Sequence, residues 1–288
     1  MGSWTRRELV SITVTPQGAV GAEVSNVDLN DLDDVTLNEL RSAYAQHSVL
    51  FFRGQKLTPA AHIKFAERWG AINANRFFTP VEKHPQIAEV RKEPEQTFNI
   101  GGGWHTDHSY DQIPALGSLL YAKEVPLMGG DTLFASCAAA FDTLSEGIKD
   151  MLRSLRAVHS SRHVFGKVAA LPDNMAGLFA NADQATQDAE HPVVIRHPLS
   201  GREVLYVNPG FTTHFAGWTV PESEALLAYL YQHIARPEHT CRFHWQPGSL
   251  AFWDNRATWH LAVNDYHGQR RLMHRITVEG EPLTAANA

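Results

Sequence analysis

The chain has 288 residues, of which 43% are hydrophobic and 19% charged, so it can bury a sizeable core and lacks the composition of a disordered protein. Its formal net charge of -6 at pH 7, without a basic stripe along the sequence, argues against a nucleic-acid-binding surface. The longest apolar runs have the length of a strand, far short of the roughly 20 residues that span a membrane.

In the first half of the chain, short strands alternate with two helices. The second helix has the clearer start, because Thr58 is a good N-cap and Pro59 suits the first helical position. Residues 92–103 are polar and rich in glycine, which predicts a loop leading into a strand that holds His105. The expected elements are a strand at 11–14, a helix burying Leu37, Leu40, Ala43 and Tyr44 with Thr36 as its N-cap, a strand at 49–52, a helix from Pro59 to Gly70, and a strand at 87–90.

Strands dominate the second half. Residues 165–190 have weak periodicity and many small or polar residues, so they are expected to be either a lid or a disordered insertion. The expected elements are strands at 116–122 and 131–134, one helix at 138–155, strands at 193–196 and 205–207, a helix at 221–234, and strands at 240–244, 249–253, 258–263 and 272–279.

This order of elements predicts an α+β fold that is mainly β, with an antiparallel core and helices packed outside it. The sequence has no internal repeat, low-complexity tract or interdomain linker. Residues 1–288 are therefore expected to form a single domain.

A histidine and a carboxylate lie two residues apart in His105-Thr106-Asp107, directly after three glycines. Side chains at this spacing share one face of an extended strand, so both are able to reach one metal ion while Thr106 points away. His260 is a candidate third ligand on a strand expected to face the first across a barrel, and its competitors are His244, His267 and His274. Two histidines and one carboxylate form the ligand set of non-haem Fe(II) oxygenases.

Arg270, Arg271 and Arg275 follow His260. Arg271 and Arg275 are four residues apart, so on a strand they share a face. Burying such side chains in a barrel requires an anionic partner, whereas on a solvated edge strand they have no binding role. Thr132, taken alone, is an ordinary strand threonine.

Several motifs occur in one order along the chain, and together they are far more specific than any one of them. The motifs are His105-Thr106-Asp107, Gly129-Gly130-Asp131-Thr132-Leu133-Phe134, and Trp253-Asp254-Asn255-Arg256 leading to His260 and Arg271. From about Val14 to Glu279 the chain resembles the taurine dioxygenase / 2,4-dichlorophenoxyacetate dioxygenase family of Fe(II)- and 2-oxoglutarate-dependent oxygenases.

The resemblance implies a double-stranded β-helix core, also called a jelly-roll and similar to cupins. It implies that His105, Asp107 and His260 bind Fe(II) and leave one position for O2. It also implies that Arg271 and Thr132 bind the distal carboxylate of 2-oxoglutarate, for which a bidentate arginine is well suited. Arg275 is then expected to meet an anionic group of the substrate.

The chain departs from the taurine enzymes where taurine is bound. The positions aligned with taurine contacts hold Asn75, Phe78 and Gly101, where those enzymes have histidine, tyrosine and asparagine. These residues favour a larger or more apolar carboxylate or sulfonate, with Phe78, Tyr110 and Phe211 as walls of its site or as plain core.

The expected activity is hydroxylation of a small organic anion with release of succinate and CO2, which for some substrates leads to C–O or C–S cleavage. Two alternatives remain: a non-catalytic metal-binding jelly-roll module, and a zinc hydrolase that uses the same ligands. We expect a homo-oligomer, either a dimer or a tetramer, without nucleic-acid or membrane partners. The N-terminal residues lack the apolar core of a signal peptide and only two cysteines are present, so we expect a cytoplasmic location.

Overall fold

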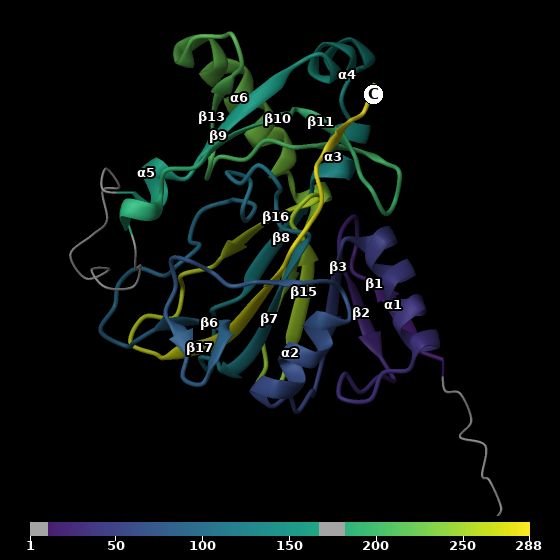
Figure 1. Ribbon diagram of the computed structural model, residues 1–288, viewed down its shortest axis with the longest axis vertical. Coiled ribbons are helices and arrows are strands. Elements are labelled where there is room, and N and C mark those ends of the chain that lie inside the picture. The colour runs from purple at the N-terminus through teal and green to yellow at the C-terminus, as the bar shows by residue number, and fades with distance from the viewer. Residues whose placement is uncertain (1–10, 167–181) are drawn as a thin grey trace, which may run out of the picture.

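The computed structural model describes residues 11–166 and 182–288 (Figure 1). Most of the predicted lid, residues 167–181, lies outside the described residues, whereas its last part joins a strand. The strands are β1 (Thr13–Pro16), β2 (Ala22–Ser25), β3 (Val49–Phe52), β4 (Ile72–Asn73), β5 (Pro80–Val81), β6 (His84–Lys92), β7 (Gly117–Glu124), β8 (Thr132–Ser136), β9 (Arg156–Ser160), β10 (Asp188–Pro192), β11 (Val194–Arg196), β12 (Glu203–Leu205), β13 (Thr212–Phe215), β14 (Thr240–Phe243), β15 (Leu250–Asp254), β16 (Thr258–Ala262), β17 (Arg271–Val278) and β18 (Thr284–Ala285).

Helices are fewer, and none in the described part of the chain is long and apolar enough to cross a membrane. The α-helices are α1 (Asp34–His47), α2 (Pro59–Glu67), α3 (Cys137–Asp142), α4 (Glu146–Arg153), α5 (Arg162–Phe165) and α6 (Val220–Ile234), with short 3₁₀ helices η2 (Ala182–Gln184) and η3 (Pro237–His239).

Within the described residues the strands form one nine-stranded sheet and three three-stranded sheets. The large sheet has the order β1-β2-β3-β15-β7-β17-β6-β5, with β4 beside β17. Its pairings are antiparallel except between β2 and β3. The prediction of a mainly β fold with few helices is therefore confirmed.

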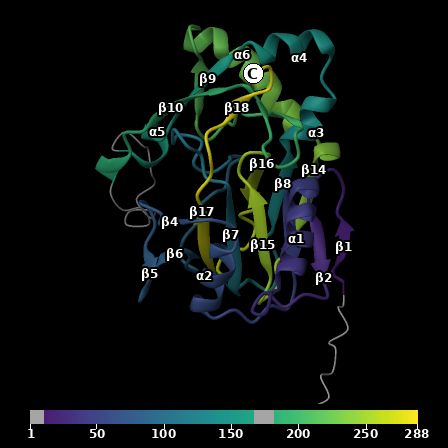
Figure 2. The same cartoon turned by 45° about the vertical axis from the view of Figure 1, so that its right-hand side comes forward.

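Helices α1 and α2 cover one face of the large sheet (Figure 2), and the sheet β14-β8-β16 packs on its other face. Strand β3 illustrates the two faces: Leu50 and Phe52 pack with helix residues, whereas Val49 and Phe51 pack with Phe134 of β8. Successive side chains of a strand point to opposite faces, so a continuous apolar run indicates a strand covered on both sides.

Two local predictions about helices are wrong, and one is confirmed. Helix α1 is capped by Asp33, whose carboxylate accepts a hydrogen bond from the backbone N–H of Thr36 at 2.7 Å, so Thr36 is not the N-cap. The single helix predicted at 138–155 is two helices, α3 and α4, with Ser145 as N-cap of the second. By contrast, Thr58 caps α2 with Pro59 at its start, although the helix ends at Glu67 rather than at Gly70.

Candidate active site

The sequence predicts that His105 lies on a strand, and this prediction is wrong. His105 instead forms an isolated antiparallel bridge with His260 of β16. Each backbone N–H donates to the other residue's carbonyl oxygen, with N···O distances of 3.1 and 2.8 Å. The two imidazoles are therefore neighbours, and the prediction that they face each other across a barrel is wrong. Thr106 does point away, since its hydroxyl donates to the carbonyl oxygen of Asn255 at 2.5 Å.

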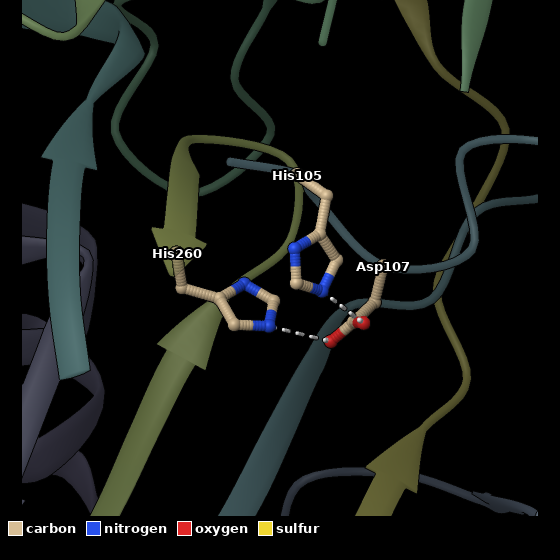
Figure 3. Close-up of side chains that lie close together, drawn as sticks. All are labelled: His105, Asp107 and His260. Atoms are coloured by element: carbon tan, nitrogen blue, oxygen red, sulfur yellow. Dashed lines mark ion pairs between the residues drawn. The ribbon is translucent and has the colours of Figure 1, made fainter. Parts of the chain in front are cut away.

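The side chains of His105, Asp107 and His260 converge (Figure 3). One potential ligand atom from each lies within 4.8 Å of the others, and each Nε2 is 3.7 Å from an oxygen of Asp107. The ring nitrogen Nδ1 of His105 donates to the carbonyl oxygen of Gly103 at 2.8 Å, which leaves the lone pair of Nε2 directed at the cluster. His244, His267 and His274 are not in this cluster.

The electrostatics of the cluster suit a divalent cation. Burial lowers the pKa of His105 and of His260, so both imidazoles are neutral ligands near pH 7. Burial raises the pKa of Asp107, but Arg275 and then the two histidines outweigh this effect and hold that pKa well below its usual range. Two neutral imidazoles and one carboxylate fit Fe(II) and leave open coordination positions.

Strand β17 lies inside the large sheet between β7 and β6, so its arginines are not on an edge strand. Arg271 and Arg275 are only 5% and 8% exposed. Arg270 points outward and pairs with Glu93 and Glu124 at 3.1 and 2.5 Å. The surface alternative is therefore wrong for Arg271 and Arg275, whereas Arg270 precedes β17 and is only half-buried.

Arg271 lines a cavity together with Thr132 and the metal-site histidines His105 and His260. Its Nε and Nη2 atoms are buried without a hydrogen-bond partner among the described residues. These two nitrogens form the edge of the guanidinium that binds a carboxylate in bidentate fashion. Burial lowers the pKa of Arg271, which is the cost of holding this cation inside the protein.

Two contacts fix the shape of this cavity, and both involve Trp245. The indole N–H of Trp245 donates to the hydroxyl of Thr132 at 2.9 Å, and the guanidinium carbon of Arg271 lies 5.6 Å from the centroid of the indole ring. Trp245 lies two residues beyond the end of strand β14, and no local sequence pattern indicated its role.

Arg275 already has partners inside the protein. Its Nη2 atom lies 2.7 Å from Oδ2 of Asp107 and 3.2 Å from the hydroxyl of Ser118. The anionic partner that burial of Arg275 requires is therefore supplied by Asp107, so this burial does not by itself demand an anionic substrate. Its Nε atom, however, has no partner among the described residues and stays available.

A second and larger cavity of about 410 Å³ opens beside the same cluster. His105, Asp107 and Arg275 line one side of it. All the sequence-predicted substrate residues lie on its wall, namely Asn75, Phe78, Gly101, Phe211, Tyr110 and Arg275. Three further residues line it that no sequence pattern had assigned there, namely Trp104, Val164 and Phe165, of which Phe165 is the first residue of the predicted lid.

Several aromatic side chains of the cavity wall pack against one another. Tyr110 and Phe211 pack edge to face with centroids 4.8 Å apart, and Phe165 lies 5.9 Å from each of them. The side-chain oxygen of Asn75 is occupied, because it accepts the backbone N–H groups of Phe77 and Phe78. Asn75 therefore shapes the turn, and its amide NH2 is the part left to contact a ligand.

Gly101 lies on the walls of both cavities. Its φ of +78° is in the left-handed region, and a Cβ atom there would lie 3.2 Å from the ring of His105. A larger residue would strain the backbone and press on a candidate metal ligand.

Comparison with known proteins agrees with this geometry. The family model described as taurine catabolism dioxygenase TauD, TfdA family matches residues 12–277. An alkylsulfatase of Acinetobacter baylyi is 36% identical over an alignment of 281 residues that covers 94% of this chain and 85% of the relative. An alpha-ketoglutarate-dependent sulfate ester dioxygenase of Pseudomonas putida is 35% identical over 270 residues, covering 92% of this chain and 88% of the relative.

The crystal structure of a taurine dioxygenase from Burkholderia xenovorans matches with a TM-score of 0.82 and 35% identity, over 96% of this chain and 94% of that one. The chain therefore belongs to the TauD/TfdA family and is a dioxygenase dependent on alpha-ketoglutarate, which is 2-oxoglutarate.

Proposed function

We propose that the protein hydroxylates an organic sulfate ester or sulfonate with an apolar body, using Fe(II), 2-oxoglutarate and O2. The observation that carries the proposal is the position of the His105–Asp107–His260 cluster between two cavities, each containing a buried arginine. The names of the two relatives favour a sulfate ester, and a carboxylate remains the second choice.

His105, Asp107 and His260 would hold the iron. When bound, iron with 2-oxoglutarate supplies the chemistry that inserts one oxygen atom of O2 into a C–H bond, with release of succinate and CO2. The bridge between His105 and His260 sets the spacing of the two imidazoles, and Ser118 and Arg275 orient the carboxylate of Asp107. Because a carboxylate occupies this position, we expect oxygenation rather than halogenation.

Arg271 and Thr132 would bind the distal carboxylate of 2-oxoglutarate. The free edge of the Arg271 guanidinium offers two parallel N–H donors, and the Thr132 hydroxyl, held by Trp245, offers a third. A zinc hydrolase or a non-catalytic module has no use for this buried cation beside the metal site.

Arg275 would bind the anionic group of the substrate through its free Nε atom while it keeps its contact with Asp107. The cavity wall of Phe78, Tyr110 and Phe211 would then enclose the apolar body. Hydroxylation at the carbon that bears the sulfate or sulfonate group leads to loss of that group, because the product collapses to a carbonyl compound.

We also infer that the large sheet and the β14-β8-β16 sheet form the two halves of a double-stranded β-helix. The apolar cluster between them, with side chains from β3, β7, β8, β14, β15 and β17, supports this inference. On the same ground we infer that residues 1–288 form one domain, as expected from the sequence. The dimer or tetramer expected from the sequence stays a prediction, which light scattering after size-exclusion chromatography tests.

The test is a panel of alkyl sulfates, alkyl sulfonates, carboxylates of matched chain length and uncharged alcohols, scored by substrate-dependent succinate release. Sulfate esters are expected to give the highest turnover, and only when Fe(II), 2-oxoglutarate and O2 are all present. Arg275→Leu should remove the preference for anions. Arg270→Leu, which removes the half-buried neighbouring arginine that points away from the cavities, should not. An uncharged best substrate, or sulfate ester cleavage without 2-oxoglutarate, would overturn the proposal.

A further inference from the structure

Lys92 ends strand β6, and its Cα atom lies directly opposite that of Arg271 on β17. Figure 1 shows the two strands side by side. Residues that oppose each other in an antiparallel pair carry their side chains on the same face. Both side chains are inside the protein, with Lys92 2% exposed and Arg271 5% exposed. Two cations are therefore buried next to each other beside the cavity that Arg271 lines.

The contacts of Lys92 do not neutralise its charge. Its Nζ atom donates to the amide oxygen of Asn264 at 2.7 Å and lies 4.2 Å from the centroid of the Tyr266 ring. In the part of the chain that the structure describes, neither Lys92 nor Arg271 forms a salt bridge, and the nearby Glu93 and Glu124 pair with Arg270. The acid that acts on Arg271 from a greater distance, Asp131, is itself paired with Arg242 and His244. Burial lowers the pKa of both cations. Two buried like charges on one face of a sheet repel each other, and a bound anion relieves this repulsion.

We propose that Lys92 is a second cationic determinant of cosubstrate selection, which together with Arg271 makes the site favour a 2-oxo acid that carries a distal carboxylate. This inference rests on the proposed role of Arg271. Lys92 does not line the cavity, so it acts through its charge and is a positioning residue rather than a catalytic one.

A purely structural role is the alternative to exclude. The side chain of Asn264, which accepts from Lys92, donates to the carbonyl oxygen of Thr97 at 2.8 Å. Lys92 thus also supports the loop that leads to Gly101, which lies on the walls of both cavities. Damage to this loop would weaken the binding of every 2-oxo acid, whereas loss of the charge would weaken only those with a distal carboxylate.

The experiment compares 2-oxoglutarate with 2-oxopentanoate, which has the same carbon chain but no distal carboxylate. Binding of each to the metal-loaded protein is measured by calorimetry under nitrogen. Lys92→Met should weaken 2-oxoglutarate by about tenfold or more, because it removes one attractive charge near the distal carboxylate, and leave 2-oxopentanoate within about twofold. Lys92→Arg keeps the charge and should keep the preference. Lys92→Gln, which still offers a donor to Asn264, is the second neutral variant if Lys92→Met does not fold.

Lys123→Met is the matched control, because it removes an exposed strand lysine that also lies near a tyrosine ring, at 5.5 Å from Tyr121. Equal weakening of both acids in the neutral Lys92 variants would assign Lys92 a structural role and overturn the inference. Unchanged binding of 2-oxoglutarate would overturn it too. A wild-type protein that does not bind 2-oxoglutarate would instead overturn the proposed function. Failure of the Lys92 inference alone is therefore distinguishable from failure of the proposed function.

Discussion

Replacing Arg271 by leucine should change cosubstrate binding and protein stability in opposite directions. The Nε and Nη2 atoms of Arg271 have no partner among the described residues, so the side chain is a buried cation whose donors are free for a carboxylate. Loss of a bidentate, charge-assisted pair is expected to weaken 2-oxoglutarate binding by about 3 kcal/mol, which is roughly a hundredfold in Kd. In the absence of cosubstrate the same change removes a buried cation for which the cost of burial outweighs the attraction of Tyr266 and Asp131. Even after the loss of the contact with Trp245, we expect stability to rise by about 1 kcal/mol.

The assay pairs calorimetric titration of 2-oxoglutarate under nitrogen with thermal unfolding of the protein free of metal and cosubstrate. Arg271→Leu should bind 2-oxoglutarate far more weakly and yet unfold a few degrees higher, at roughly 2–4 °C per kcal/mol. Arg270→Leu serves as the control, since this half-buried arginine pairs with acids near the surface and its loss should change neither quantity appreciably. Unchanged affinity, or a variant that is less stable than wild type without cosubstrate, would refute the reasoning.

The other predictions concern residues around and beyond the metal site. Asp107→Ala should abolish iron binding, measured by metal analysis, and substrate-dependent succinate formation; near wild-type hydroxylation would contradict the ligand assignment. Arg275→Leu should destabilise the protein by roughly 3 kcal/mol in urea unfolding, because it leaves the carboxylate of Asp107 buried without its cation, and Arg275→Lys should recover part of this loss. Burial lowers the pKa of His62 to about 3, against 6.5 for the free group, so unfolding should become easier as the pH falls from 6.5 towards 3. The free energy of unfolding of His62→Leu minus that of the wild type should therefore rise by about 2 kcal/mol when the pH is lowered from 8 to 5. The control His267→Gln, at an exposed position, should show no such rise.

Patterns that act over a few residues were predictable from the sequence. The continuous apolar run of β3 identified a strand covered on both faces, and Thr58 with Pro59 identified the start of α2. The spacing of Arg271 and Arg275 correctly placed them on one face of a strand. In each case the physical signal, a side-chain period or a capping group, is contained in the segment itself.

Features that depend on contacts between distant segments were not predictable in this way. The direct bridge between His105 and His260 joins residues far apart in the chain, so periodicity gave no indication that they are neighbours. The pairing of Arg275 with Asp107 is likewise a tertiary contact, and it removed the premise that the arginine lacked a partner. The burial of Lys92 is a property of the assembled sheet, since a lysine at the end of a strand is usually exposed.

The bridge between His105 and His260 also bears on how the apoprotein behaves. Two backbone hydrogen bonds hold these ligand-bearing segments together. Bringing His105 and His260 together costs conformational entropy, because the chain between them is long, and we expect contacts of the fold rather than metal coordination to offset that cost. Zinc fingers are the opposite case, because they unfold without their metal. Chelation should therefore leave this protein folded, with the amide protons of His105 and His260 still protected from hydrogen exchange. Iron would add stability only by mass action, in proportion to the logarithm of its free concentration, so the protein could be purified without metal and reloaded afterwards.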